Sequence, residues 1–249
     1  METERNNTKA VAAISCFNEA KYVGMVVAAA LMHVDTVIVV DDGSTDGTGQ
    51  VAQAAGAHVV QHSHQMGAGA AARSCLQAGL NQDADVLVTL DGDGQHDANE
   101  IPDVMAPVLQ GQSDLVIGSR FMGKSNNVAA YRRFGIWVIT ALYNVGAAVT
   151  VADAQSGFRA YGRQALETLS ITENGFGFSV ETLVEARRAG LRICEVPISC
   201  FYHSESHSLN PVVHGVTVAL DVVRQRILTP NPYHHGRLIG PSRQAKLHE

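Results

Sequence analysis

Residues 85–96 read Asp-Val-Leu-Val-Thr-Leu-Asp-Gly-Asp-Gly-Gln-His, and the expected fold class follows from this stretch. Its first half is a short run of apolar and β-branched residues, which is typical of a strand buried on both faces. The second half starts at Asp91 and passes through two glycines and a second acid, Asp93, before reaching Gln95. A buried strand that ends in an acidic loop predicts a parallel sheet whose carboxyl edge carries polar side chains.

The same alternation of strand and helix signals runs through the first half of the chain. Strands are predicted at residues 11–15, 36–40, 57–61, 85–90 and 114–118, and helices at 19–32, 47–55, 68–80 and 100–109. Apolar strands separated by helices favour a parallel sheet that is covered on both faces. Beyond residue 125 the pattern predicts helices at 129–149, 179–189 and 211–228, an extended segment at 156–161 and a strand at 191–197.

Composition excludes several classes of protein. The chain has 249 residues, of which 46% are hydrophobic, so it can bury a sizeable core. Its formal net charge of −6, with 18 lysines and arginines, offers no general basic surface, and we therefore expect no nucleic-acid partner. Four scattered cysteines form no Cys-x-x-Cys pair, which indicates reduced thiols in a cytoplasmic protein rather than a zinc site or disulfide framework.

One uncharged segment raises the question of a membrane. Residues 134–152 carry no charged side chain and reach the length of a membrane span. Polar residues and glycines interrupt the segment, and the mean hydropathy of the whole chain is only +0.03. We therefore expect a helix that is buried in protein or lies along a bilayer surface, and peripheral membrane contact stays open.

The acidic strand ends carry the chemistry. Two carboxylates one residue apart, Asp91 and Asp93, suit Mg²⁺ or Mn²⁺, although an inert solvated turn has the same pattern. The preceding acidic loop, residues 41–48, reads Asp-Asp-Gly-Ser-Thr-Asp-Gly-Thr. Its carboxylate at Asp42 can accept hydrogen bonds from a nucleobase or ribose, while Asp46 can cap the following helix.

These two loops and three further segments resemble family 2 glycosyltransferases of the GT-A fold, in particular the branch similar to dolichyl-phosphate mannose synthase, which uses polyprenyl phosphates. The segments are Cys16-Phe17-Asn18-Glu19, residues 41–48, residues 91–96, Gly118-Ser119-Arg120-Phe121 and Asp153-Ala154-Gln155-Ser156-Gly157-Phe158-Arg159, with Glu195-Val196-Pro197-Ile198 as an additional match. The resemblance covers about residues 10–200. It implies a Rossmann-like, mostly parallel sheet with helices on both faces, followed by a C-terminal helix.

The resemblance also implies roles for particular residues. A nucleotide-sugar donor would be held by Phe17, Asn18, Glu19, Asp42, Gly67, Gly69, Asp91 and Gly92. A divalent Mg²⁺ or Mn²⁺ ion would be held by Asp91, Asp93 and Gln95, and would neutralise the charge that develops on the leaving diphosphate. The predicted catalytic residues are Asp93, Arg120 and Arg159. The acceptor phosphate would meet Arg120, Arg132, Arg133 and His203, the last standing where the family generally has an arginine.

The acceptor is inferred from a missing motif. Relatives that glycosylate a hydroxyl group need a general base and usually carry a Glu-Asp pair, which this sequence lacks. A phosphate monoester is already anionic at pH 7 and needs no base, so the pattern favours a polyprenyl-phosphate lipid acceptor. His203 and His207 could donate hydrogen bonds to that phosphate, or could lie in a solvated loop.

We therefore predict a metal-dependent inverting glycosyltransferase with a catalytic domain over residues 1–210 and an apolar helix and flexible tail over 211–249. Three alternatives remain: a transferase acting on a soluble or protein-linked acceptor, a non-catalytic sugar-nucleotide binding protein, and a dehydrogenase. The dehydrogenase would use Gly67-Ala68-Gly69, but these glycines stand too far from the preceding strand for a dinucleotide-binding turn.

Residues 62–64 (His-Ser-His) lack cysteine partners at zinc spacing and are predicted to form a solvated loop. A homodimer also stays open.

Overall fold

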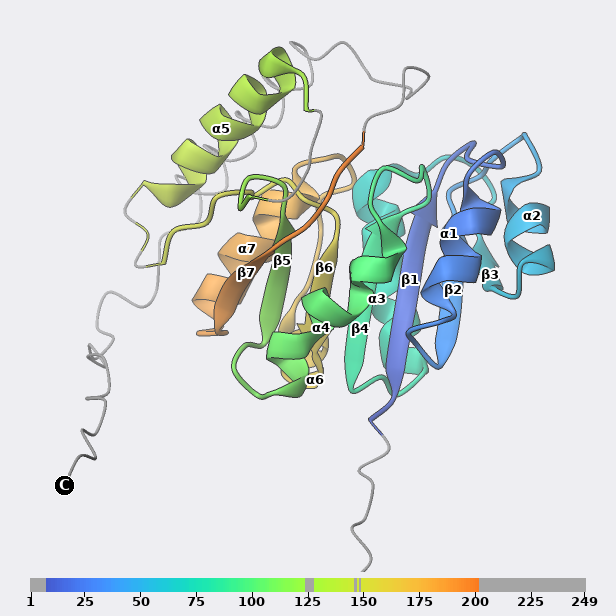
Figure 1. The fold of residues 1–249 in the computed structure, drawn as a ribbon, viewed down its shortest axis with the longest axis horizontal. Coiled ribbons are helices and arrows are strands. Elements are labelled where there is room, and N and C mark those ends of the chain that lie inside the picture. Colours follow the sequence, from blue (N-terminus) through green and yellow to red (C-terminus); the bar gives the residue numbers. More distant parts are fainter. Residues whose placement is uncertain (1–7, 124–127, 146, 148, 202–249) are drawn as a thin grey trace, which may run out of the picture.

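A computed structural model describes residues 8–123, 128–145, 147 and 149–201, and within these residues it contains one seven-stranded sheet (Figure 1). The strand order is β3-β2-β1-β4-β6-β5-β7. Neighbouring strands are parallel except at β6, which runs antiparallel to both β4 and β5. The strands are β1 (Ala10–Cys16), β2 (Thr36–Asp41), β3 (His58–Gln61), β4 (Val86–Asp91), β5 (Leu115–Ser119), β6 (Arg159–Gly162) and β7 (Ile193–Pro197). The predicted mostly parallel sheet is confirmed.

Helices cover both faces of the sheet, as the alternation of apolar residues requires. In β1, Val11 and Ala13 join one buried cluster, whereas Ala12 and Ile14 join the other, because successive side chains of a strand point to opposite faces. The first cluster includes residues of α3 (Ala68–Asn81), α5 (Ala130–Asn144), α6 (Arg163–Thr168) and α7 (Phe178–Arg188). The second includes residues of α1 (Val23–Ala30), α2 (Thr48–Ala54) and α4 (Ile101–Leu109), which follows the short 3₁₀ turn η1 (Ala98–Glu100).

The first helix is shorter than predicted. α1 begins at Val23 rather than at Glu19, because the backbone amides before it are bonded to the loop after β2. Asn18, whose φ is +58°, donates its N–H to Ser44 Oγ at 2.9 Å, and Glu19 donates to Thr48 Oγ1 at 2.8 Å. These bonds hold residues 17–20 as a turn that sequence periodicity does not reveal.

The helix after β5 is also shorter than predicted. α5 ends at Asn144, whose side chain bonds both the N–H and the carbonyl of Val151, at 3.0 and 2.7 Å. Within the described ranges, no helix is long and apolar enough to cross a membrane. The six-residue α6 was not predicted. The expected helix at 211–228, the tail, His203, His207 and the domain boundary at 210 lie outside the described residues.

Candidate active site

The two acidic loops lie on either side of the carboxyl end of β1. Strand register places Asp41 beside Cys16 and Asp91 beside Ser15. The next residues continue this pairing, since Asp42 donates its N–H to the Cys16 carbonyl at 2.8 Å and Gly92 donates to the Ser15 carbonyl at 3.0 Å. The parallel sheet therefore brings together three segments that are far apart in sequence: residues 16–19, 41–48 and 91–96.

The acidic loop after β4 is the predicted metal site. Asp91 Oδ1 accepts a hydrogen bond from the Ser15 hydroxyl at 3.2 Å, and Asp93 Oδ1 accepts one from the Gln95 N–H at 2.9 Å. Gly92 packs against Cys16, where a Cβ atom would overlap the sulfur. Gly157 packs against Asp91, where a Cβ atom would lie 2.8 Å from Oδ2. Both glycines therefore allow close approach of the backbone around the acidic loop.

Negative charge gathers at this edge of the sheet. Burial raises the pKa of Glu19 to about 7, and the nearby carboxylates Asp46 and Asp91 add to the shift. Among the residues that the structure describes, no group of three or more His, Cys, Asp or Glu side chains is arranged as a metal centre. Mg²⁺ sites commonly use only one or two carboxylates and complete their shell with phosphate oxygens and water. The donor set of Asp91, Asp93 and Gln95 fits such an ion.

Asp42 is held from three directions. Its Oδ1 accepts hydrogen bonds from His62 Nδ1 at 2.7 Å and from the Met66 N–H at 2.9 Å, while Oδ2 accepts one from the Gly67 N–H at 2.9 Å. His62 Nε2 lies 2.9 Å from Ser74 Oγ. The prediction of a solvated loop is wrong for His62, whose side chain is only 10% exposed, because the Asp42 carboxylate draws it inward.

The glycines before α3 serve a close backbone contact. Gly67 has a φ of +103°, and a Cβ atom there would lie 2.5 Å from the Asn174 carbonyl oxygen. Gly69 donates its N–H to the same oxygen at 2.8 Å and would collide with the Glu173 carbonyl if it carried a side chain. Glu181 fixes this loop by accepting the N–H of Glu173 at 2.9 Å. These glycines therefore have a structural explanation apart from any donor contact.

Arg120 forms a buried bidentate ion pair with Asp153. Its Nε and Nη2 lie 2.7 and 2.8 Å from the two carboxylate oxygens. Burial alone would raise the pKa of Asp153, but the charge and hydrogen bonds of Arg120 outweigh burial and lower it. Glu195 accepts the N–H groups of Ala152 and Asp153 at 2.6 and 2.9 Å, and burial raises the pKa of Glu195.

Arg159 lies inside the fold. Its side chain donates to the carbonyl oxygens of Ser156, Ala154 and Ser179 at 2.9, 2.9 and 3.0 Å, and the residue is 1% exposed. Such bonds hold the segment that packs against Asp91. The geometry thus favours a positioning role for Arg159, and its catalytic role stays a prediction.

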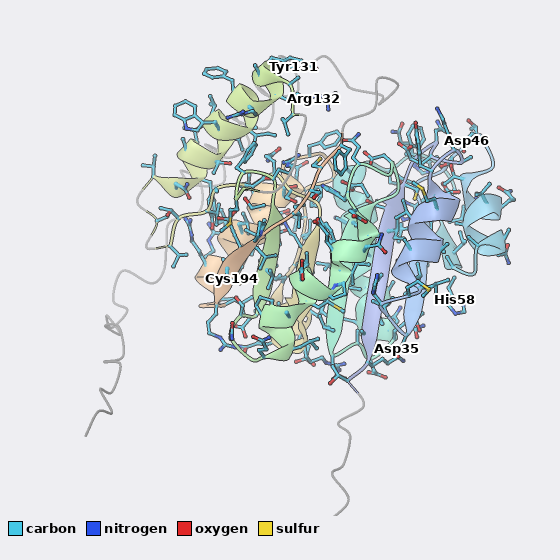
Figure 2. The ribbon with its side chains drawn as sticks, viewed as in Figure 1. Asp35, Asp46, His58, Tyr131, Arg132 and Cys194 are labelled. Atoms are coloured by element: carbon cyan, nitrogen blue, oxygen red, sulfur yellow. The ribbon has the colours of Figure 1, made fainter. Side chains whose placement is uncertain are left out.

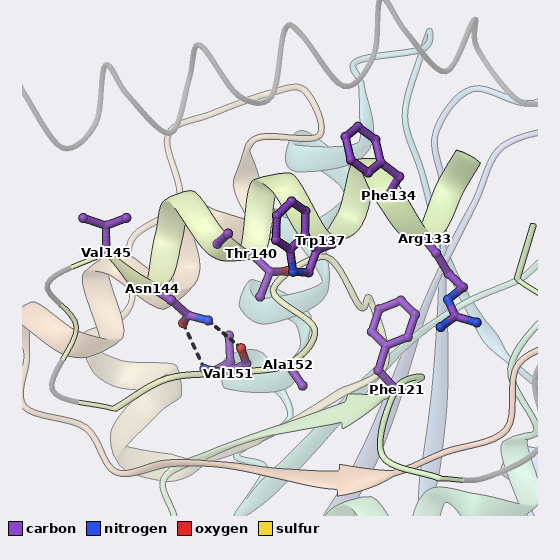
Figure 3. A pocket seen from close by; sticks show the side chains of 10 residues that line it. Phe121, Arg133, Phe134, Trp137, Thr140, Asn144, Val145, Val151 and Ala152 are labelled. Atoms are coloured by element: carbon purple, nitrogen blue, oxygen red, sulfur yellow. Dashed lines mark hydrogen bonds between the residues drawn. The ribbon is translucent and has the colours of Figure 1, made fainter. Parts of the chain in front are cut away.

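α5 borders an open groove of about 780 Å³ (Figure 3). Figure 2 shows Tyr131 and Arg132, at the start of α5, on the same side of the molecule as Asp46, whereas Asp35 lies on the opposite side. The groove lining is mainly apolar and comprises Phe121, Arg133, Phe134, Trp137, Thr140, Ala141, Asn144, Val145, Val151 and Ala152. Phe134 and Trp137 are 67% and 62% exposed and stack with ring centroids 6.0 Å apart.

The described residues thus place most of the predicted site at one edge of the sheet. The residues around the end of β1 are Phe17, Asn18, Glu19, Asp42, Asp91 and Gly92. Arg120 follows β5, which points the same way as β1 but is separated from it by β4 and β6. Sequence patterns missed the roles of His62, Asp153 and Glu195. The last two stand inside motifs that were recognised, whereas nothing in the local sequence connects His62 to Asp42.

The seven-stranded, mostly parallel sheet with acidic loops at its carboxyl edge has the architecture of the GT-A class of α/β folds. The model of "Glycosyl transferase family 2" matches residues 12–170, so the chain belongs to this family and is a glycosyltransferase.

Individual relatives agree with this assignment. The chain is 31% identical over 207 residues to glycosyltransferase AglJ of Haloferax volcanii, covering 82% of this chain and 67% of the relative. It is 35% identical over 173 residues to the undecaprenyl-phosphate mannosyltransferase of Micrococcus luteus, covering 66% and 70%. The fold is similar to glucosyl-3-phosphoglycerate synthase of Mycobacterium tuberculosis, solved with Mn²⁺, UDP-glucose and phosphoglyceric acid, with a TM-score of 0.70, 22% identity and coverage of 91% and 82%.

Proposed function

We propose that this enzyme transfers a sugar from a nucleoside diphosphate to a polyprenyl phosphate, with inversion at the anomeric carbon and with Mg²⁺ or Mn²⁺ as cofactor. The observation that carries the proposal is the position of the groove along α5. Two of its lining residues, Phe121 and Ala152, directly adjoin the Arg120–Asp153 pair in sequence. Arg133 is itself a lining residue and is exposed, so a cationic side chain stands at a mainly apolar groove, as an acceptor with a phosphate head and an isoprenoid chain requires.

The donor would occupy the carboxyl edge of the sheet around β1. Glu19 and Asp42 would contact the nucleoside, and the backbone at Phe17, Asn18 and Gly92 would shape the pocket. The divalent ion would be held by Asp91, Asp93 and Gln95. When bound, it would neutralise the negative charge that develops on the leaving diphosphate. Supporting this arrangement, the related fold of glucosyl-3-phosphoglycerate synthase has been solved with Mn²⁺ and UDP-glucose.

The transfer itself needs no protein base. An ionised oxygen of the acceptor phosphate attacks the anomeric carbon from the face opposite the diphosphate and forms the new C–O bond. The old bond from carbon to diphosphate oxygen breaks, and the nucleoside diphosphate leaves with the electron pair. Arg120 would orient the acceptor phosphate, with Arg133 at the groove and Arg132 near it, and Asp153 would keep the Arg120 guanidinium in place.

Contact with a membrane surface forms part of the proposal. Phe134 and Trp137 expose their rings beside Arg132 and Arg133, a combination that suits the interface between acyl chains and anionic head groups. The undecaprenyl-phosphate mannosyltransferase to which the chain is similar has, by its name, a lipid phosphate acceptor. A homodimer stays an open question of the sequence analysis.

The test is transfer of labelled sugar from nucleotide-sugars to polyprenyl phosphate in the presence of Mn²⁺, followed by organic extraction. We expect the label in the organic phase. Replacing both Phe134 and Trp137 by serine should raise the KM for polyprenyl phosphate about tenfold or more, with little change in affinity for the nucleoside diphosphate. Met32→Ser, at an exposed apolar position outside the groove, is the matched control.

Other outcomes would contradict the proposal. Label that stays in the aqueous phase on a sugar alcohol or protein would indicate a soluble acceptor. Binding of a nucleotide-sugar without turnover against any acceptor would indicate a non-catalytic binding protein.

A further inference from the structure

The hydrogen-bonding capacity of Asp42 is nearly filled by the protein itself. Each oxygen of a carboxylate offers about two acceptor positions. Both positions of Oδ1 are taken, by His62 Nδ1 at 2.7 Å and by the Met66 N–H at 2.9 Å. Among the residues that the structure describes, only the Gly67 N–H bonds Oδ2, at 2.9 Å. One acceptor position therefore remains for a ligand, and it is on Oδ2.

His62 is the side chain that fills Oδ1. A carboxylate only accepts hydrogen bonds, so the imidazole nitrogen that faces it, Nδ1, carries a proton. The other nitrogen, Nε2, is fixed by Ser74 Oγ at 2.9 Å. With side-chain exposures of 10% for His62 and 5% for Asp42, water competes little for these bonds. The imidazole is thus anchored at both ends and holds one oxygen of Asp42 away from a ligand.

We propose that His62 sets the base specificity of the donor site and that the site takes a nucleoside diphosphate whose base is uracil or thymine. These bases present one ring N–H between two carbonyl groups, which matches a single open acceptor position. Guanine presents two adjacent donors, N1–H and N2–H, and pairs with a carboxylate through both oxygens. With Oδ1 filled, one guanine donor would be left unpaired in a site that is largely closed to water, which weakens binding.

The inference rests on the proposed function, because it takes Asp42 as the contact to the nucleoside. The experiment is calorimetric titration of the full chain with UDP and with GDP in the presence of Mn²⁺. For the wild-type protein, UDP should bind at least about tenfold more tightly than GDP. In His62→Ala, Oδ1 regains an acceptor position, so the preference for UDP should fall by about tenfold.

Two further variants distinguish positioning from simple damage to the fold. His62→Asn places an amide N–H near the position of Nδ1 and should keep the preference of the wild-type protein. His64→Ala removes the exposed neighbouring histidine, which bonds Ser63, and should leave both affinities unchanged. Partial unfolding lowers the active fraction for both nucleotides equally, so the ratio of the two affinities reports specificity.

The outcomes separate the two proposals. If the wild-type protein binds neither nucleotide, the proposed function fails. If it binds GDP as tightly as UDP, or if His62→Ala stays folded with an unchanged ratio, the role of His62 is overturned while the proposed glycosyl transfer stands.

Discussion

Glu19 makes the stability of the protein depend on pH. Its pKa of about 7 in the folded protein lies above the ordinary value of 4.5, so folding favours the protonated carboxyl group. The contribution of Glu19 to the free energy of unfolding should therefore fall as pH rises from about 4.5 to about 7, and the full loss should persist above pH 7. We expect Glu19→Gln to melt at a higher temperature than the wild-type protein at pH 8 and at the same temperature at pH 4.

Thermal unfolding at the two pH values checks this prediction. Mn²⁺ provides the control, because a cation near Asp91 offsets part of the negative charge that raises the pKa of Glu19. The difference at pH 8 should therefore shrink when Mn²⁺ is added. If the melting temperatures of the two proteins differ by the same amount at pH 4 and at pH 8, the ionisation of Glu19 does not cause the difference.

The Arg120–Asp153 ion pair should contribute to the free energy of unfolding. Both partners are buried, and removing Asp153 takes away the bidentate ion pair of a buried guanidinium group. We expect Asp153→Ala to lower the free energy of unfolding by about 3–5 kcal/mol, measured by urea denaturation. The exposed pair of Arg163 and Glu167, 2.6 Å apart, serves as the control, and Arg163→Ala should change stability little. Losses of similar size in both variants would contradict the assignment of a buried pair.

At the scale of elements, the site depends on how closely the ends of β1 and β4 pack. A methyl group at Gly92 would overlap the sulfur of Cys16, on the adjacent strand. We expect Gly92→Ala to destabilise the protein by about 1–3 kcal/mol in urea denaturation. Adding Cys16→Ala should recover most of that loss, because the remaining Cβ of residue 16 lies 3.5 Å from the new methyl group.

A second glycine supplies the matched control for this packing argument. Gly135 lies inside α5, and a Cβ atom there would meet nothing within 4 Å. Gly135→Ala should therefore stabilise the protein by about 0.5–1 kcal/mol, through lower entropy of the unfolded chain. If Gly92→Ala and Gly135→Ala change the free energy of unfolding by the same amount, the close contact between β1 and β4 does not explain the loss of stability in Gly92→Ala.

For the whole molecule, binding at the acidic edge should appear as thermal stabilisation. A ligand present at 100 times its Kd adds about 2.7 kcal/mol, which raises the Tm of a domain of this size by roughly 5–10 °C. We expect Mn²⁺ together with UDP to raise the Tm, and Asp93→Asn to abolish most of the increase. Asp83→Asn, at an exposed site, should retain it. An undiminished increase in Asp93→Asn would exclude this residue from the metal site.

Local patterns in the sequence were enough to predict the strands, most helices and the family. The runs at 36–40 and 85–90 alternate between two buried faces, and this alternation is a property of each strand alone. The helix boundaries near Asn18 and Asn144 were not predictable in the same way. The first is set by a hydrogen bond to Ser44, 26 positions further on, and the second by hydrogen bonds to Val151, in the loop seven positions beyond Asn144.

The tertiary structure decided how the polar side chains pair. Asp42 and His62 are 20 positions apart, and Arg120 and Asp153 are 33 apart, so no short-range pattern links them. The folded sheet brings each pair into a nearly dry environment, where an unpaired charge or polar group is costly and partners are therefore drawn together. Sequence motifs indicated which carboxylates and arginines are candidates for the site. The folded arrangement decided which atoms of these side chains already have hydrogen-bond partners within the protein.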